Sequence, residues 1–389
     1  DRSNPMKSFD ADSKLHTILA SDNKAYFNQG IIAALSIQLP EFANIELFEA
    51  APHAKKFRVV AQAFVESIIW RKKETISNRL KDYINQVVIQ KHRLHDLFIN
   101  TILLVTSQPN HYFNSDFLHN HLMKFSMADR DEWWTPFIHS QYPVDSDDVT
   151  PIQRMIDWAW TDDKRENISD ESIRLMCQTM FWFLTSTNRA LRDCTTKAII
   201  CLLEERINVL IELIKIFQKV NDPYILQRLY AIACGCAVRT NQVASLKKLG
   251  ECILDTVFNT ENVIPDILLR DYAKGVIDYA VFKGHIFDFD LNKTRPPFKS
   301  HLPTVFPSNE EIEKLKFDYQ DKLRVYNTGM FATFKPIYAG VMYQLNKFSN
   351  HQTHGLIFVG GVDWDLGQDD FMTLNVGYSY QLDFTGVTS

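Results

Sequence analysis

Apolar residues recur every three or four positions through most of the chain before residue 320. This spacing places them on one face of a helix, and it predicts helices over residues 54–75 and 78–107. Pro109-Asn110 ends the second run, because both residue types favour turns. Further helices are expected to begin at polar clusters, since Ser, Thr and Asp accept hydrogen bonds from the free amides of a helix start. These clusters are Ser115-Asp116, Ser146–Thr150 and Ser169–Glu171.

Three later segments share one pattern of a polar entry, an arginine, and then small and apolar residues. They run over residues 188–202, 222–237 and 265–280, and their arginines (Arg192, Arg228 and Arg270) are spaced by 36 and 42 residues. Helix-pair repeats have periods of about 40–47 residues, and such a pair buries its apolar face only by stacking on its neighbours. We therefore expect a mainly α fold, a HEAT/TPR-like helical-repeat solenoid of the kind that usually binds other macromolecules.

The end of the chain has a different pattern. Most of the 13 glycines follow residue 328, and apolar and polar residues alternate over residues 337–345, 356–366 and 371–384. This predicts a short C-terminal antiparallel β segment. Two interpretations stay open, strands of an outer-membrane barrel or a sheet with one buried face; three strands cannot close a barrel. The expected domains are a helical region (1–165), helical repeats (166–320) and a β-strand tail (327–389).

Composition argues against several classes of protein. The net charge of −5 and the pI near 6.2 argue against a nucleic-acid binder that works by bulk electrostatics. All six cysteines lie in apolar helical patterns, so we expect buried free thiols and a cytoplasmic location. A transmembrane helix needs a run of about 18 or more apolar residues, and no run in the sequence is that long. The start, Asp1–Pro5, has neither a Met nor a signal sequence, and we expect a fragment.

Catalytic signatures are missing from the sequence. It contains no P-loop, dinucleotide-binding, zinc-protease or nucleophile-elbow motif, so no catalytic, cofactor or metal residues are predicted and the chain is not expected to be an enzyme. Six histidines cluster between His92 and His139, and His92 and His95 could share a helix face. No third ligand follows at a recognised spacing, so solvated histidines are favoured over metal ligands.

Eight residues are candidates for partner contact or for structural roles. In the run Asp129–Trp134, Trp and Arg are the residue types that dominate interface hot spots. The alternative, which we favour, has the tryptophans packing between helices while the charges cap and pair. The Arg-Asp pairs at 192–193 and 270–271 are expected to form polar ladders between helices. The candidates are Asp129, Arg130, Trp133, Trp134, Arg192, Asp193, Arg270 and Asp271.

Several motifs follow one another in a fixed order between residues 55 and 315. They are Asp129–Trp134, Ile138–Tyr142, Pro151-Ile152, Asp157–Trp160, Trp182–Arg189, Leu191–Asp193, Thr196–Ala198, Asn221–Tyr224, Arg228–Tyr230, Leu269–Ala273 and Arg295–Pro297. Together they resemble one family, the antiviral STAND NTPases (AVAST or Avs proteins) of prokaryotes, in the region that follows their ATPase. The resemblance implies a helical sensor that binds a phage structural protein such as a terminase or portal subunit. It also implies ATP-dependent homo-oligomerisation that activates an N-terminal effector. This chain lacks the ATPase and effector motifs, so we expect it to bind but not to catalyse.

Three short motifs stand out in the tail: Asn327–Met330, Lys335–Gly340 and Leu374–Tyr380. They resemble a second family, the PorP/SprF outer-membrane proteins of the type IX secretion system. It implies contact with a membrane only where the tail is a genuine barrel segment. Two other origins of the tail stay open. It is either a foreign segment joined to the chain near Lys316–Tyr326 or a β-rich cap on the helices. For the whole chain, the rivals to the sensor are a generic helical-repeat scaffold with another protein partner and a fragment of an outer-membrane protein.

Overall fold

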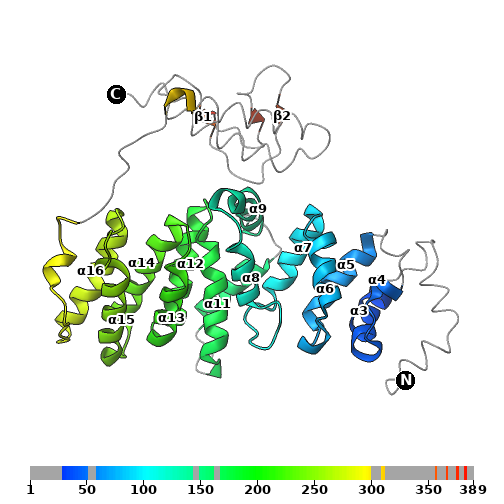
Figure 1. Cartoon of the computed structure of the whole chain (residues 1–389), viewed down its shortest axis with the longest axis horizontal. Helices are drawn as coiled ribbons and strands as arrows, with labels where there is room; N and C mark the ends of the chain where they lie inside the picture. The colour runs from blue at the N-terminus through cyan, green and yellow to red at the C-terminus, as the bar shows by residue number, and fades with distance from the viewer. Residues whose placement is uncertain are drawn as a thin grey trace. The chain divides into compact units, whose positions relative to one another are not determined.

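The computed structural model (Figure 1) describes residues 29–50, 58–142, 149–161, 167–298 and 308–311, together with four two-residue strands. Over these residues the protein is mainly helical, which confirms the predicted fold class at that level. The chain divides into two compact units, each assembled from separate stretches of sequence. The first comprises Asp1–Lys124, Pro151–Trp182 and Cys201–Leu213, and the second Phe125–Thr150, Phe183–Ile200 and Ile214–Ser389. This division does not coincide with the domain boundary expected at residue 165.

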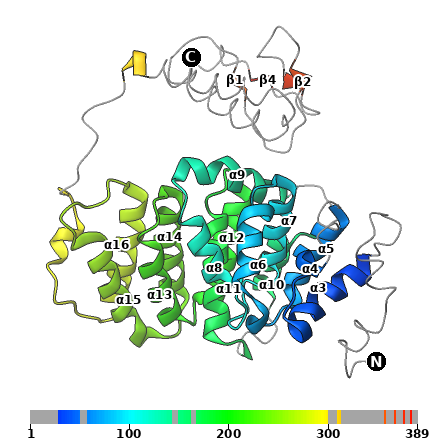
Figure 2. The same cartoon turned by 45° about the vertical axis from the view of Figure 1, so that its right-hand side comes forward.

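The first unit consists of helices packed against one another. Helix α5 packs against both α3 and α7, and α10 packs against α7; Figure 2 shows α3, α5 and α7 side by side. Their apolar stripes form a core that includes Phe64, Ile68, Phe98 and Ile156. The helices are α3 (Gln29–Ala43), α4 (Leu47–Ala50), α5 (Arg58–Ser67), α6 (Asn78–Tyr83), α7 (His92–Leu103), α8 (Ser115–Leu122), α10 (Pro151–Trp160) and most of α11 (Asp170–Phe183).

The two long helices expected in this unit are interrupted. The run over residues 54–75 contains α5 and a 3-10 turn at Ile68–Trp70, and residues 54–57 lie outside the described part of the chain. The run over 78–107 contains α6, a π turn at Ile84–Val88 and α7, which ends at Leu103, before Pro109. A π turn adds a residue without removing the apolar face, so the hydrophobic pattern continues where the helix does not.

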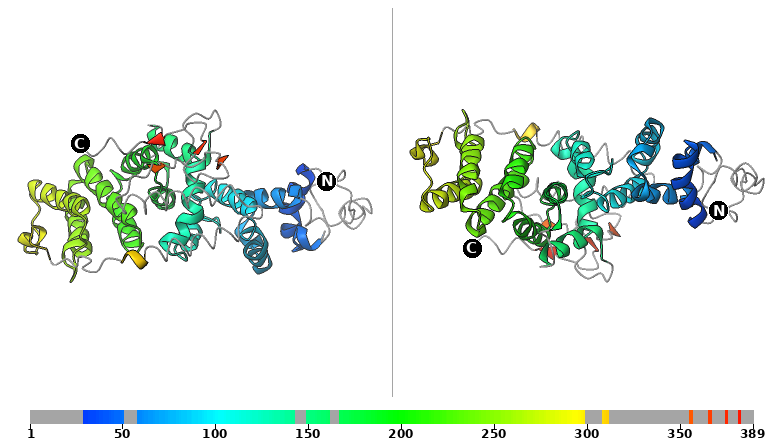
Figure 3. Two further views of the ribbon diagram at one scale, coloured as in Figure 1. Left: turned by 90° about the horizontal axis from the view of Figure 1, so that it is seen from above. Right: turned by 90° about the horizontal axis from the view of Figure 1, so that it is seen from below.

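The second unit contains the segments with the repeated pattern. Helix α16 packs against α14 and α15, and Figure 3 shows this yellow-green to yellow part of the chain from two sides. Helices α11, α12 and α13 contribute residues to both units. The further helices are α9 (Met127–Ser140), α12 (Arg189–Leu203), α13 (Ile207–Phe217), α14 (Pro223–Arg239), α15 (Leu246–Ile253) and α16 (Ile267–Phe282).

Polar caps begin the three patterned helices, as the sequence predicts. The side chain of Asn188 accepts a hydrogen bond from the Leu191 amide before α12. The side chain of Asp222 accepts hydrogen bonds from the amides of the first turn of α14, where Pro223 is the first helical residue. The side chain of Asp266 caps α16 in the same way. Each cap satisfies amides that have no partner inside the helix. The helices therefore begin close to the residues that the local pattern indicates.

Small residues bring these helices close together. A Cβ atom on Gly235 of α14 would lie 2.5 Å from Cδ1 of Ile200 on α12, closer than carbon atoms approach. A Cβ on Gly275 of α16 would lie 3.2 Å from Sγ of Cys234 on α14. Glycine is costly inside a helix, so its presence at both positions is explained by the space that the neighbouring helix occupies.

In the tail, the structure describes only β1 (Gly355–Leu356), β2 (Asp365–Leu366), β3 (Leu374–Asn375) and β4 (Gln381–Leu382). β1 pairs antiparallel with β4, with Gly355 opposite Leu382. β2 pairs antiparallel with β3, with Asp365 opposite Asn375. The rest of the predicted β segment over 327–389 lies outside the described residues, as does the junction near Lys316–Tyr326. Among the described helices, none combines the length and the apolar character that crossing a bilayer requires.

Candidate functional site

The polar and aromatic run on α9 is built into the core of the second unit. Ser126 caps the helix by accepting a hydrogen bond from the Asp129 amide, 3.2 Å away, while Asp129 itself is exposed. Arg130 is buried, with Nη2 2.8 Å from Oδ2 of Asp222. Trp134 is fully buried, and Trp133 packs with its ring 5.8 Å from that of Trp134. Arg130 and Trp134 therefore stabilise the fold in this conformation and present no surface to a partner.

Asp222 has two structural roles. Its Oδ1 accepts hydrogen bonds from the amides of Tyr224 and Ile225 at the start of α14, while its Oδ2 pairs with Arg130. Burial, and then the negative charge of Asp222, raise the pKa of the neighbouring Asp131 above its ordinary value. The ion pair of Arg130 and Asp222 therefore links α9 to the start of α14.

The arginines of the patterned helices contact neighbouring segments. Asp193 of α12 lies 2.9 Å from Nη2 of Arg228 on α14. The guanidinium of Arg192 lies over the ring of Tyr224, 4.9 Å from its centroid, and burial lowers the pKa of Arg192. Arg270 lies in the same way over Phe298, at 4.4 Å. Asp193 thus forms a polar contact between two helices, α12 and α14.

Asp271 is the last of the candidate residues. It follows Arg270 on α16, but its side chain is exposed to solvent. The expected Arg270-Asp271 ladder is therefore replaced by an arginine–aromatic contact, because the chain after α16 brings Phe298 back beside Arg270. Of the eight candidates, Asp129 and Asp271 are the exposed ones.

Arg174 of α11 lies at the centre of a polar cluster in the first unit. It is buried, and its guanidinium donates to Oδ1 and Oδ2 of Asp116 on α8 at 3.0 and 2.9 Å. It also donates to Glu171, at 2.9 and 2.8 Å, and to Gln178. Partial burial alone would raise the pKa of Asp116, but the hydrogen bonds from Arg174 and Gln178 and the arginine charge lower it. A guanidinium with so many fixed acceptors is a structural bridge between α8 and α11.

The expectation of solvated histidines is wrong for the described part of the cluster. His95, His111 and His121 are buried, because α7, α8 and the loop between them pack these rings inside the first unit. His111 accepts a hydrogen bond from the Phe113 amide at Nδ1 and donates from Nε2 to the Ile68 carbonyl, 3.0 Å away. The amide contact requires an unprotonated Nδ1, so the ring is neutral, and burial lowers its pKa.

The two histidines of α8 point to different neighbours. His119 accepts a hydrogen bond at Nδ1 from the indole N–H of Trp182 on α11, 3.2 Å away. His121 stacks on Phe117 and faces His95. Burial is the main reason that the pKa of each histidine falls to about 4. Both rings are therefore neutral at pH 7.

Groups suited to metal or nucleophilic chemistry are not assembled in the described residues. Within them, no set of three His, Cys, Asp or Glu side chains is placed to hold a metal ion. Burial raises the pKa of the thiols of Cys177, Cys234 and Cys252. A thiol attacks as its thiolate, so these three cysteines are poor nucleophiles at neutral pH.

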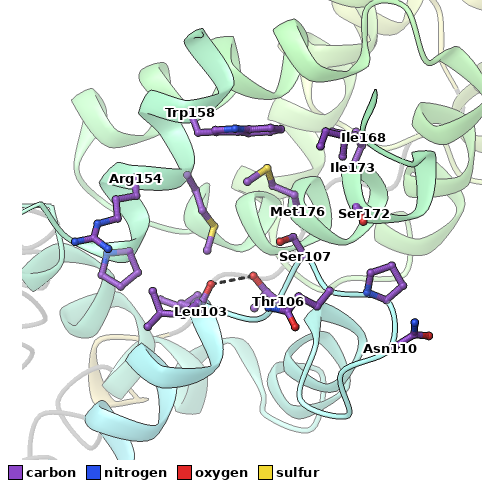
Figure 4. Close-up of a pocket in the computed structure, with 15 residues that line it drawn as sticks. Leu103, Thr106, Ser107, Asn110, Arg154, Trp158, Ile168, Ser172, Ile173 and Met176 are labelled. Carbon is purple, nitrogen blue, oxygen red and sulfur yellow. Dashed lines mark hydrogen bonds between the residues drawn. The ribbon is translucent and has the colours of Figure 1, made fainter. Parts of the chain in front are cut away.

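The first unit contains an open groove (Figure 4). Its volume is about 650 Å³, and its walls come from the end of α7, the loop that follows, α10, and the start of α11. In Figure 4, Trp158 lies across the top and Met176 projects toward the centre. Leu103 and Thr106 lie below, where Thr106 donates a hydrogen bond to the Leu103 carbonyl. Ile168 lies at one side.

The described lining of the groove is mostly apolar. Among the described residues that line it, Arg154 of α10 is the one with a charged side chain, and it is exposed. Leu104 and Ile168 are apolar yet 45% and 36% exposed. Grooves with these properties bind apolar groups, and a placed charge fixes their orientation.

The sequence alone does not reveal this groove. Its three walls are separated by many residues, and each apolar side chain also fits the core-facing stripe of its own helix. One local signal is present: Ile168 and Ile173 flank the Ser169 cap, in the positions of a hydrophobic staple,. Both isoleucines line the groove, but the signal indicates a helix start and not a binding surface.

Comparison with known proteins gave no match to a family model, to a curated protein or to a solved structure. The resemblances described for the sequence therefore rest on its own motifs. Two structural features bear on function. One is the set of contacts among the patterned helices, and the other is the groove of the first unit.

Proposed function

We propose that this protein is the helical sensor part of an antiviral STAND NTPase, and that it binds a phage structural protein of the terminase or portal class without catalysis of its own. The observation that carries the proposal is the series of capped helices α12, α14 and α16. The motifs that resemble the sensor region, at Leu191–Asp193, Asn221–Tyr224 and Leu269–Ala273, lie at the starts of these helices.

The contacts between these helices support a helical-repeat architecture. Asp193 and Arg228 join α12 to α14, and Gly235 and Gly275 allow close packing against the preceding helix. In a repeat protein each unit buries its apolar face on its neighbours, and the stack offers an extended surface to a partner. We therefore propose recognition as the function of this protein, because the polar groups described above hold the helices together.

A binding measurement tests the proposal. The full chain is immobilised and exposed to a panel of purified terminase large subunits and portal subunits from different phages, with biolayer interferometry as the readout. We expect saturable binding to at least one member, and none to unrelated proteins of similar size and charge. Failure to bind any member would contradict the sensor assignment. Equal binding to the unrelated proteins would instead favour a generic scaffold.

An ATPase measurement tests the second half of the proposal. The sequence holds no P-loop, so we expect ATP turnover by the purified chain to equal the buffer blank, in the presence and absence of the bound phage protein. Turnover that co-purifies with the chain and persists after a second chromatography step would contradict it.

A further inference from the structure

We propose that three arginines near the starts of α12 and α14 form a binding site for a carboxylate on a protein partner. They are Arg189, Arg192 and Arg228, here called the arginine cluster. The inference rests on the proposed function, because it assigns the chemistry by which the partner is held. All three residues belong to the second unit.

One aspartate connects two members of the arginine cluster. Oδ1 of Asp193 lies 2.9 Å from Nη2 of Arg228, and its Oδ2 lies 3.5 Å from Nε of Arg189. Helices α12 and α14 therefore bring two guanidiniums to the same carboxylate. Among the described residues, neither of these arginines forms a salt bridge with a second carboxylate.

Arg192 lies beside this pair without a carboxylate of its own. Its guanidinium lies over the ring of Tyr224, 4.9 Å from the centroid, and donates to the backbone carbonyl of Ser186. Burial lowers the pKa of Arg192. The other two arginines of the cluster also lower it, whereas Tyr224 and Asp193 raise it. Two cations and one carboxylate thus act on this guanidinium.

The charge balance of the cluster differs from that of the buried arginines elsewhere in the described chain. Arg71 and Arg130 each pair with a carboxylate, and Arg174 has three around it. In the arginine cluster three guanidiniums share Asp193, which leaves a surplus of two positive charges among the described residues. Like charges at short range repel one another, so a further anion is stabilised at this place.

The arginine cluster is accessible to a partner. The side chain of Arg189 is 87% exposed and that of Arg228 is 25% exposed, while Tyr224 is 48% exposed. A guanidinium presents two parallel N–H donors to a carboxylate. Arginine and tyrosine are also the residue types that dominate the energy of protein interfaces. The site therefore fits an Asp or Glu side chain that lies beside the tyrosine ring.

A protein carboxylate is favoured over the phosphates of a nucleic acid. The whole chain has a net charge of −5, which repels a polyanion at long range, whereas a single carboxylate responds to the local surplus of positive charge. Two acid-rich segments of the chain, residues 143–148 and 162–166, lie outside the described residues. Their carboxylates are rival occupants that the experiment has to separate from those of a partner.

Two peptides test the inference. Both are flexible glycine–serine peptides with the same fluorescent dye, and one carries glutamates where the other carries glutamines. Binding to the full chain is followed by fluorescence anisotropy at low salt. We expect the glutamate peptide to bind about tenfold more tightly than the glutamine peptide, as for several partly exposed charge pairs. Added salt should reduce this preference.

Arginine variants locate the binding. Arg192→Gln and Arg189→Gln should each weaken binding of the glutamate peptide about three- to fivefold. Arg270→Gln is the matched control, because Arg270 lies over an aromatic ring in the same way, at 4.4 Å from that of Phe298. It lies outside the arginine cluster, so its replacement should leave the affinity unchanged. Thermal unfolding of each variant checks that the fold is retained.

Asp193→Asn tests the arginine cluster in the opposite direction. Asparagine keeps the shape of the side chain but removes the charge that Arg189 and Arg228 share. The glutamate peptide should therefore bind about threefold more tightly. A purely structural role of the arginines predicts no such gain.

Rival occupants are tested in the same assay. Exchanging every Asp for Asn and every Glu for Gln in residues 143–148, or in residues 162–166, should leave the affinity for the glutamate peptide unchanged. Tighter binding would show that the chain's own segment occupies the cluster, and the assignment to a partner would fall. Single-stranded DNA should displace the labelled peptide less effectively than the unlabelled glutamate peptide does. The reverse order would assign the cluster to nucleic acid and overturn the proposal.

The outcomes separate this inference from the function on which it rests. No preference for the glutamate peptide, or the same loss in Arg270→Gln as in Arg192→Gln, would overturn the carboxylate site. If a phage protein binds and the Arg189 and Arg192 variants do not weaken that binding, the sensor function stands and the arginine cluster is not its site. If the peptides bind as expected and no phage protein does, the carboxylate site stands and the sensor function falls.

Discussion

At the scale of single residues, Asp222 is a position where one side chain has two structural roles. One oxygen of its carboxylate caps α14, and the other neutralises the buried guanidinium of Arg130. A charge removed from water is tolerated only with a partner in good geometry. The capping role resembles that of Asp266 at α16, where no buried arginine depends on the carboxylate, so the two aspartates form a natural comparison.

Replacing Asp222 with Ala should therefore cost more than replacing Asp266. Asp222→Ala leaves Arg130 buried without its anion, and we expect the free energy of unfolding to fall by about 3–5 kcal/mol. Asp266→Ala removes a cap, and we expect a loss of about 1 kcal/mol. Urea unfolding followed by circular dichroism measures both. Equal losses would mean that the cap, and not the buried charge, is the main contribution of Asp222.

The buried histidines predict a pH dependence. His119 and His121 have pKa values of about 4 in the folded protein, against about 6.5 in an unfolded chain. Below pH 6.5 the unfolded state binds protons that the folded state does not, so stability present above pH 6.5 is lost as the pH falls toward 4. Each histidine contributes a slope of up to about 1.4 kcal/mol per pH unit.

Urea unfolding at pH 7, 6 and 5 measures this slope. His121→Phe keeps an aromatic ring beside Phe117 but cannot bind a proton, so we expect a smaller loss of stability between pH 6.5 and 4 than in the unmodified chain. A variant with an unchanged slope would show that His121 titrates alike in the folded and unfolded states.

At the scale of elements, the packing of α14 on α12 depends on Gly235. A side chain there meets Ile200, and overfilling a packed interface costs about 1–3 kcal/mol. We expect Gly235→Val to destabilise the chain in that range even though valine is the better helix former. Combining it with Ile200→Ala, which opens the space, should restore part of the loss. Thermal unfolding of the two single variants and the double variant forms a cycle, and strictly additive losses would contradict the proposed contact.

The same elements show what sequence can and cannot predict. The starts of α12, α14 and α16 are local, since Asn188, Asp222 and Asp266 act on amides a few residues away. The break between α6 and α7 is not visible, because the apolar stripe continues across the π turn. The Arg130–Asp222 pair joins residues 92 positions apart. No local sequence pattern indicates that two residues so far apart in the chain form a pair.

The groove illustrates the same limit for the candidate site. Met155 and Trp158 lie on the apolar side of a predicted helix, and the sequence gives no reason to separate residues that face the core from those that face a hollow. That distinction depends on where the end of α7 and the start of α11 lie. The sequence therefore predicts the helices and several of their ends, but it does not identify the surface that they form together.

At the scale of the whole molecule, the proposed helical-repeat architecture predicts how the chain unfolds. Stability in a helical-repeat protein is a sum of local terms between neighbours, so distant parts can open separately. The chain carries its own reporters, because Cys177 of the first unit and Cys236 of the second are fully buried. A buried thiol reacts with an alkylating reagent only after the structure around it opens.

Pulse labelling with N-ethylmaleimide across a urea gradient, read out by peptide mass spectrometry, compares the two thiols in a single sample. We expect Cys177 and Cys236 to become reactive at different urea concentrations, because each reports the local packing of its own helices. Cys252, also buried in the second unit, should follow Cys236 more closely than Cys177. One coincident transition for all three would indicate a single cooperative domain, and the helical-repeat architecture would have to be abandoned.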